Sequence, residues 1–424
     1  MSQRQTIVFF PEGAYGPTNN CVGIGQVLKR RGAHVVFVVE ESFAGTLEAQ
    51  GFEEALMRLK PAPTASALES PGQFWKEFVR DTTPEFRKPT IEQLEGFVLP
   101  VWQELVDGAR YVDGRLGEIF EEVRPDVIVQ DNVVGFPAVV ASGRPWVRIV
   151  SCNPLELKDP ALPPTFSGYP TGDRARWDEF RARYRDLHAP LQQEFSEFCV
   201  ERGAPPLPGI EFIHESPYLD LYLYPPDADY ERSRPLGPWR RLGSCVREAG
   251  AGYVLPADER RTLYLSLGSL GSADVALMQK LIDTLGTTEH RVVVSMGPQH
   301  EELRLADNMV GEEFLPQPSI LPEVDLVIAH GGNNTVTESL HFGKPMVVLP
   351  LFWDQHDNAQ RMQELGLGRR LDTYGHEPGE LTGAIDELLG DAELTRRLAA
   401  SSRRLQAEPG TVEAADLIER LAKS

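Results

Sequence analysis

The pattern of apolar and polar positions predicts that strands and helices alternate along the chain. Short, continuous apolar runs are typical of strands that are buried on both faces of a parallel sheet. The first half of the chain contains four such runs: Ile7–Phe10, Val35–Val39, Val127–Gln130 and Val147–Val150. The second half contains four more: Leu263–Leu267, Arg291–Ser295, Leu326–Ala329 and Met346–Leu349. This alternation favours an α/β fold with parallel sheets.

Segments with apolar residues at helical spacing lie between these runs. In the first half they predict helices over Cys21–Arg31, Ser42–Gln50, Gln73–Val79 and Ile91–Val123. In the second half they predict helices over Ala273–Thr284, Thr335–His341, Asp354–Leu365, Gly379–Leu389, Asp391–Gln406 and Val412–Ala422. The Pro-rich stretch Asn153–Gly172 is predicted to be a long loop, and long ordered loops are often functional.

The chain is too long for one hydrophobic core. It has 424 residues, whereas single cores stop growing at roughly 250–300 residues. The stretch 229–258 lacks apolar periodicity and is interpreted as a linker. We therefore expect a first domain over 1–228, a second over 259–405 and a C-terminal helix over 406–424. Two doubly wound domains would face a cleft, with ligands beyond the carboxyl ends of their strands.

Composition narrows the classes of partner and the compartment. A formal net charge of −21 argues against nucleic acid or an anionic membrane as partner, because both require clustered Lys and Arg. The four cysteines form no CxxC pair, so neither a zinc site nor a disulfide framework is indicated. No apolar run approaches the ~20 residues needed to span a bilayer, and the start shows no signal-peptide pattern. We therefore expect a cytoplasmic protein.

The strongest chemical signal follows the predicted strand Leu326–Ala329. His330 stands at the end of this strand, where its ring could donate a hydrogen bond to a diphosphate oxygen. Two glycines follow and let the backbone turn tightly and approach a ligand. Asn334 and Thr335 then open a helix whose free N–H groups can cradle a phosphate. A local arrangement of this kind would serve an acidic protein that binds a diphosphate.

Three more polar side chains belong to the same run. Glu338 lies one helical turn after Asn334 and near the same face, where its carboxylate could accept hydrogen bonds from a ribose diol. Asp354 and Gln355 open the helix that follows the next predicted strand, where they could bind sugar hydroxyls. An ordinary strand-turn-helix has no reason to carry all of these groups at consecutive strand ends.

The run from His330 to Ala359 resembles the nucleotide-sugar-binding signature of the UDP-glycosyltransferase superfamily, which includes plant secondary-product enzymes and bacterial macrolide glycosyltransferases. The segment Phe314–Gln317 is similar to the Trp-x-Pro-Gln of that family, and Tyr264–Ser269 is similar to its strand-Gly-Ser. The resemblance implies a donor site formed by Ser269, Phe314, Leu315, His330, Gly332, Asn333, Asn334, Thr335, Glu338, Asp354 and Gln355.

The family's residue roles transfer to this chain position by position. The His and the Asn-Ser/Thr pair hold the diphosphate, the Glu holds the ribose hydroxyls, and the Asp-Gln pair holds the donor sugar. Phe314 would flank the base in place of Trp, and Ser269 would touch a phosphate. The resemblance implies a GT-B fold with a C-terminal helix that crosses back to the first domain. It also implies an inverting transfer with no metal and no cofactor besides the nucleotide sugar.

The donor and the setting can be narrowed by the same resemblance. A carboxylate at Glu338 suits a ribonucleotide, so UDP is favoured over dTDP. Asp354 and Gln355 look like the pair found in glucose-transferring relatives, so the expected donor is UDP-glucose or a close relative. The macrolide enzymes in the family point to natural-product or antibiotic biosynthesis, with a small molecule as acceptor. The sequence leaves the oligomeric state open.

The base expected of this family is missing. An inverting transfer to a hydroxyl needs a group that removes the acceptor proton, and the family supplies a His from a Gly-His-Val-Asn-Pro segment. Here Pro17 stands at the place of that His, after Ala14-Tyr15-Gly16. Asp131, at the end of the strand Val127–Gln130, could act instead as a carboxylate whose pKa is raised by burial. It could equally be a helix-capping residue.

Other hypotheses also account for the absence of the His. The acceptor could be a thiolate, phenolate or carboxylate that needs little help. The protein could also bind a sugar nucleotide without catalysis, help another enzyme, or act as a UDP-sugar epimerase or hydrolase on the same fold. Tyr15, Glu12 and Asn19 are further first-domain candidates for the base.

The acceptor pocket is expected to be apolar. Aromatic residues cluster between Phe74 and Trp102, and some of them could line a cleft while the others pack in the core. We expect a pocket for a lipophilic or aromatic acceptor, with Tyr15, Pro17, Asn19, Phe74 and Phe78 as its candidate residues.

Overall fold

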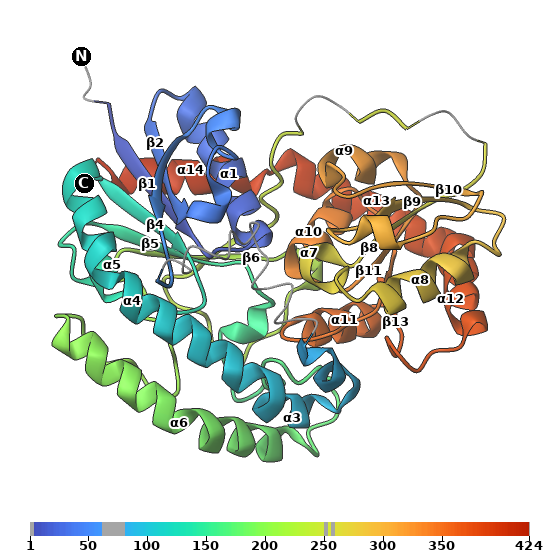
Figure 1. Cartoon of the computed structure of the whole chain (residues 1–424), viewed down its shortest axis with the longest axis horizontal. Coiled ribbons are helices and arrows are strands. Elements are labelled where there is room, and N and C mark those ends of the chain that lie inside the picture. The colour runs from blue at the N-terminus through green and yellow to red at the C-terminus, as the bar shows by residue number, and fades with distance from the viewer. Residues whose placement is uncertain (1–3, 62–80, 250–252, 256–258, 424) are drawn as a thin grey trace.

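The structure, a computed structural model, describes residues 4–61, 81–249, 253–255 and 259–423. It contains two parallel sheets that lie side by side (Figure 1). The first sheet has the strand order β3-β2-β1-β4-β5-β6-β7, and the second has the order β10-β9-β8-β11-β12-β13. Helices cover both sheets, as expected for strands that are buried on two faces. The predicted α/β fold with two Rossmann-like sheets is confirmed.

The strands of the first sheet are β1 (Thr6–Pro11), β2 (His34–Glu40), β3 (Glu53–Met57), β4 (Val127–Asp131), β5 (Trp146–Val150), β6 (Leu219–Leu223) and β7 (Arg240–Leu242). Those of the second sheet are β8 (Thr262–Ser266), β9 (Arg291–Ser295), β10 (Met309–Glu312), β11 (Leu326–Ala329), β12 (Met346–Val348) and β13 (Gly368–Arg370). All eight predicted strands are present. The strand β7 lies inside the stretch that we expected to be an irregular linker.

The helices of the first half are α1 (Tyr15–Arg30), α3 (Thr90–Gln93), α4 (Leu99–Val123), α5 (Pro137–Val140) and α6 (Trp177–Glu201). Those of the second half are α7 (Gly268–Gly271), α8 (Val275–Leu285), α9 (Gln317–Ile320), α10 (Asn333–His341), α11 (Gln355–Glu364), α12 (Pro378–Gly390), α13 (Ala392–Ala407) and α14 (Gly410–Leu421). The predicted helix Gln73–Val79 lies outside the described residues.

The helix predicted over Ser42–Gln50 was wrong. Two short 3-10 turns, Glu41–Phe43 and Glu48–Gln50, occupy this segment. Gly45 lies between them with a φ of +80°, a conformation that interrupts a right-handed helix. The apolar spacing across this segment therefore reflects two buried side chains, Phe43 and Leu47, rather than the continuous face of one helix.

The C-terminal helix α14 crosses back to the first sheet (Figure 1). It packs along α1, where Arg31 forms ion pairs with Asp416 and Glu419. The backbone N–H of Gly410 also donates to the carbonyl of Ser244, at 3.1 Å. This crossing was implied by the resemblance and is confirmed. It ties the last residues of the chain to the first domain.

Each sheet reverses its winding between two neighbouring strands. In the first sheet the reversal lies between β1 and β4, and in the second it lies between β8 and β11. Adjacent strands that lead away in opposite directions leave a crevice beyond their carboxyl ends, which is where open α/β sheets bind ligands. Glu12 and Asp131 stand at the first crevice, and Gly268 and His330 stand at the second.

Candidate active site

The imidazole of His330 lies between two glycine backbones. A Cβ added to Gly268 would stand 2.7 Å from His330 Cε1, and one added to Gly332 would stand 2.5 Å from Nε2. Gly268 also has a φ of +71°, which side chains rarely adopt. The loops after β8 and β11 therefore meet at this ring, and only glycine permits the ring to sit there.

The environment of His330 sets its charge. Burial lowers the pKa of the ring to about 4, so the imidazole is neutral at pH 7 and offers one N–H donor. Ser269 follows Gly268 and is half-buried. Asn334 and Thr335 lie in the first turn of α10, whose N-terminal N–H groups add donors. This arrangement offers an anion neutral donors rather than local positive charge.

Glu338 is buried and fully engaged in hydrogen bonds. Its Oε1 accepts from Arg247 Nη1 at 3.0 Å and from Asn334 Nδ2 at 3.3 Å, and its Oε2 accepts from Gln317 Nε2 at 2.6 Å. Burial raises the pKa of this carboxyl, and Arg247 opposes that rise. No sequence pattern pointed to Arg247, which lies 91 positions away from Glu338. A ribose diol at this carboxylate would share it with these donors.

The Asp354–Gln355 pair begins α11. Gln355 Oε1 accepts from the backbone N–H groups of Leu351 and Phe352, at 3.0 and 3.3 Å. Asp354 Oδ2 accepts from the backbone N–H of Asn153 at 2.8 Å. Burial raises the pKa of Asp354 to about 7. Because Asn153 follows β5, a loop of the first domain holds a carboxylate of the second.

The rest of this loop is fastened to the same helix. Asp357 Oδ2 accepts from the backbone N–H of Phe166 at 2.6 Å, and its Oδ1 accepts from that of Gly168 at 2.8 Å. Both donors have positive φ, at +68° and +59°. Asn153 also donates to Asn358 Oδ1 at 2.8 Å. The Pro-rich loop predicted from the sequence is thus an ordered bridge between the two domains.

Two exposed aromatic side chains lie close together between the domains. Phe314 is 48% exposed and its ring centroid lies 6.1 Å from that of Tyr15, which is 51% exposed. Leu315, beside Phe314, is 9% exposed. Tyr15 starts α1, so the acceptor half contributes an aromatic ring next to the residue expected to flank the nucleotide base.

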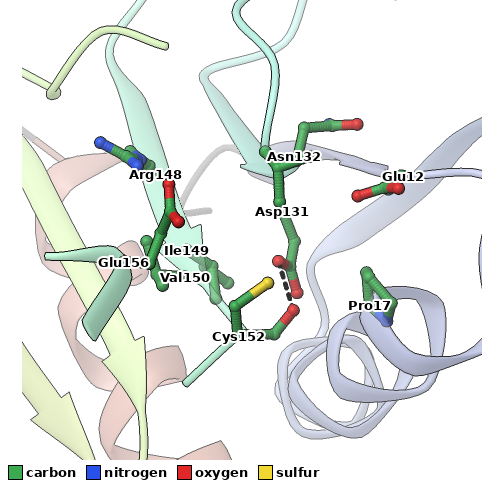
Figure 2. A pocket seen from close by; sticks show the side chains of 11 residues that line it. Glu12, Pro17, Asp131, Asn132, Arg148, Ile149, Val150, Cys152 and Glu156 are labelled. Atoms are coloured by element: carbon green, nitrogen blue, oxygen red, sulfur yellow. Dashed lines mark hydrogen bonds between the residues drawn. The ribbon is translucent and has the colours of Figure 1, made fainter. Parts of the chain in front are cut away.

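A small cavity lies beyond the ends of β1, β4 and β5 (Figure 2). It measures about 20 Å³, room for about one water molecule. Pro17 lines it at the start of α1, and Asp131 lines it at the end of β4. The space would accommodate a reacting hydroxyl group but not a whole acceptor molecule.

Asp131 has the features expected of a functional carboxyl. It is 2% exposed, its Oδ1 accepts from Ser151 Oγ at 2.7 Å, and its Oδ2 has no hydrogen-bond partner within the described ranges. Burial raises its pKa to about 8, and the charge of Glu12 contributes to that rise. Glu12 lines the same cavity, and burial together with the charge of Asp354 raises its pKa to about 7.

The remaining acceptor candidates fall in three groups. Pro17 lines the cavity, while Tyr15 and the half-buried Asn19 lie on the same helix, α1. Phe74 and Phe78 lie outside the described residues. Three further members of the aromatic cluster are buried core residues: Phe86, Phe97 and Trp102. They pack on Phe352 and Trp353 of the second domain.

The described part of the chain contains no helix that is both long and apolar enough to cross a bilayer. Within the same residues, no group of three or more His, Cys, Asp or Glu side chains is arranged to hold a metal ion. All four cysteines, Cys21, Cys152, Cys199 and Cys245, are free thiols.

Comparison with known proteins places these features in a family. Residues 279–421 match the family described as Erythromycin biosynthesis protein CIII-like, C-terminal domain. Oleandomycin glycosyltransferase of Streptomyces antibioticus is 26% identical over 97% of this chain and 90% of its own length. Zeaxanthin glucosyltransferase of Pseudescherichia vulneris is 28% identical over 72% of this chain and 76% of its own.

Solved structures share the fold over the whole chain. The glycotransferase of kitacinnamycin superposes with a TM-score of 0.70, at 22% identity, over 99% of this chain and 100% of its own. Spinosyn rhamnosyltransferase SpnG, complexed with thymidine diphosphate, superposes with a TM-score of 0.61, at 19% identity, over 98% and 100%. The fold and the strand-end loops define a glycosyltransferase of the GT-B class. The chain is similar to the antibiotic glycosyltransferases of the UDP-glycosyltransferase superfamily.

Proposed function

We propose that the protein transfers a sugar from a nucleotide sugar to a small lipophilic or aromatic acceptor, with inversion at the anomeric carbon and without a metal. The observation that carries this proposal is the meeting of two strand-end clusters. Asp354 of the donor half and Glu12 of the acceptor half lie close enough for the charge of one to raise the pKa of the other. A sugar held at Asp354 would therefore face the cavity that Asp131 lines.

The predicted donor residues would bind the successive parts of the nucleotide. His330, Ser269 and the first turn of α10, with Asn334 and Thr335, would hold the diphosphate. Glu338 would hold the ribose, which favours UDP, and Phe314 would flank the base.

The donor sugar would lie between α11 and the first domain. Asp354 and Gln355 would bind its hydroxyls, as in glucose-transferring relatives, and UDP-glucose or a close relative is the proposed donor. Gly332 and Asn333 would complete the turn, and Asn333 Nδ2 already donates to the carbonyl of Leu223 in the first domain at 3.2 Å. No cofactor takes part besides the nucleotide sugar.

The acceptor proton would leave through the small cavity. Pro17 cannot accept a proton, so a carboxyl group that lines this cavity would take over from the absent imidazole. Asp131, which is buried and has an unpartnered oxygen among the described residues, is the candidate that the sequence predicted. The acceptor oxygen attacks the anomeric carbon, and the bond from that carbon to the diphosphate breaks with its electron pair on the leaving group. The four free thiols support a reducing, cytoplasmic location.

The carboxyl groups near the sugar position favour a second candidate, hydrolysis or epimerisation of the sugar nucleotide. One experiment separates the candidates: incubation with UDP-glucose or dTDP-glucose, with and without a panel of phenols, alcohols and thiols, while nucleoside diphosphate release is measured. We expect release that depends on an acceptor. Release without any acceptor indicates hydrolysis, and tight UDP binding without turnover on any acceptor rejects the transferase.

A further inference from the structure

Two carboxyl groups stand side by side at the reversal of the first sheet. Strands β1 and β4 are adjacent and pair Pro11 with Asp131 in register. The backbone N–H of Glu12 donates to the carbonyl of Asp131 at 2.8 Å, which continues that pairing by one residue. Figure 2 shows Glu12, Asp131 and Pro17 of α1 among the side chains that line the cavity. The backbone therefore brings Glu12 and Asp131 to neighbouring positions at the carboxyl ends of β1 and β4.

The hydrogen bonds of Asp131 leave a position for a shared proton. Its Oδ1 is occupied by the hydroxyl of Ser151, while its Oδ2 has no partner among the described residues and is buried. A buried carboxylate oxygen without a donor is costly, and a proton on that oxygen removes the charge that burial disfavours. The charge of Glu12 adds to this effect, because it raises the pKa of Asp131.

The charges around the pair are mostly of the same sign. Asp354 of α11 acts on Glu12 from the second domain. Burial raises the pKa of the Cys152 thiol, which follows β5, and the charges of four carboxyl groups raise it further. Glu156 and Arg148 line the opposite wall of the cavity, where Figure 2 places them next to each other. Because these buried carboxyl groups raise one another's pKa, their protonation is coupled.

On the basis of the proposed transfer reaction, we propose that Glu12 and Asp131 form a carboxyl pair that shares one proton, and that Glu12 receives the proton of the acceptor hydroxyl. Asp131 holds the shared proton and Glu12 is ionised before the reaction. During transfer the acceptor O–H bond breaks, its oxygen bonds to the anomeric carbon, and the proton passes to the Glu12 carboxylate. The nucleoside diphosphate leaves with the electron pair of the broken bond.

The positions of the two carboxyl groups indicate that Asp131 holds the shared proton and that Glu12 receives the acceptor proton. Asp131 lines the cavity and is 2% exposed, whereas Glu12 is half-buried and lies near enough to Asp354, where the donor sugar is proposed to bind, to be affected by its charge. Burial raises the pKa of both carboxyl groups, that of Glu12 to about 7 and that of Asp131 to about 8, so both titrate near neutral pH. The pair replaces the missing imidazole with a base that is ionised at neutral pH.

The test compares Glu12→Gln with Glu40→Gln. Glu40 ends the neighbouring strand β2, so the control removes the same charge from the same sheet edge without touching the cavity. We expect Glu12→Gln to lower kcat/KM for an aliphatic alcohol at least ~100-fold while UDP binding stays unchanged and the thermal midpoint does not fall. Glu40→Gln should behave like the unaltered protein. Asp131→Asn, which keeps a neutral partner beside Glu12, should lose less than Glu12→Gln.

Acidic acceptors distinguish a base from a structural role. A nitrophenol that is already ionised needs no base, so Glu12→Gln should transfer to it at nearly the original rate. In the unaltered protein the rate of transfer to the alcohol should rise with pH through about 7, as the pKa of Glu12 requires. In Glu12→Gln this rise of the rate with pH should be absent. Equal losses on both acceptors, or no loss at all, overturn the assignment of Glu12. Failure of the unaltered protein on every acceptor overturns the proposed transfer instead.

Discussion

The substitution Gly332→Ala is expected to disable the donor site while leaving the fold intact. Gly332 has a φ of −57° and a ψ of 137°, which alanine adopts without strain. The new Cβ would stand 2.5 Å from His330 Nε2, whereas a normal contact is about 3.5 Å. The ring must therefore move by about 1 Å, and the Gly268 backbone, which also approaches the ring closely, restricts that movement.

The expected loss of UDP affinity follows from the hydrogen bond that His330 would no longer make. A hydrogen bond to a charged phosphate contributes about 1.5–3 kcal/mol, which corresponds to roughly 10- to 100-fold in the dissociation constant of UDP. Isothermal titration calorimetry measures that constant directly. Gly114→Ala is the matched control, since a Cβ at that position of α4 meets nothing within 4 Å; we expect it to bind UDP normally.

A double-mutant cycle tests whether the effect passes through the ring. If Gly332→Ala acts only by displacing His330, it should have little further effect in a His330→Ala background. Unchanged UDP affinity in Gly332→Ala, or additive losses in the cycle, would refute the assignment of the imidazole to the diphosphate.

Three further outcomes are expected. Arg247→Met should lower the free energy of unfolding in urea by about 2 kcal/mol, because it leaves the 2% exposed Glu338 carboxylate without its cation; unchanged stability would contradict this. Asp357→Asn should lower the free energy of unfolding by about 1–2 kcal/mol and speed amide exchange in the loop that this carboxyl holds; unaltered exchange would contradict the role of that loop as a bridge between the domains. Burial raises the pKa of Glu12 from 4.5 to about 7 and that of Asp131 from 3.8 to about 8, so between these values the folded protein binds more protons than the unfolded chain. The free energy of unfolding should therefore fall as the pH rises from about 4 to about 8, less so in Asp131→Asn, and an equal fall in that variant would contradict the assignment.

The sequence predicted the central strands because each is a continuous apolar run, as in Val127–Gln130 and Leu326–Ala329. It missed β6 (Leu219–Leu223), which interrupts its leucines with polar residues, and β13 (Gly368–Arg370), which ends in two arginines. It also missed the long helix α6, whose surface is too charged for a clear periodicity. The strand β13 lies at the edge of its sheet, where its two arginines are only half-buried, whereas β6 is buried although it contains polar residues.

The donor residues were predictable because they lie close together in the sequence, from His330 to Gln355. The residues that complete the site were not, since they are brought there by topology alone. Arg247 reaches Glu338 across 91 positions, and Asn153 reaches Asp354 across 201. Ser151 was overlooked for the same reason, because its partner Asp131 belongs to a neighbouring strand.

Helix α11 carries contacts that have a thermodynamic consequence. Its first residues face the proposed sugar position through Asp354, and the same turn fastens the acceptor-side loop through Asp357. Occupancy of one substrate site therefore changes the free energy of ordering the other. Linkage makes that effect reciprocal: whatever factor the donor contributes to acceptor affinity, the acceptor returns to the donor. The two substrates of this protein are expected to bind cooperatively rather than independently.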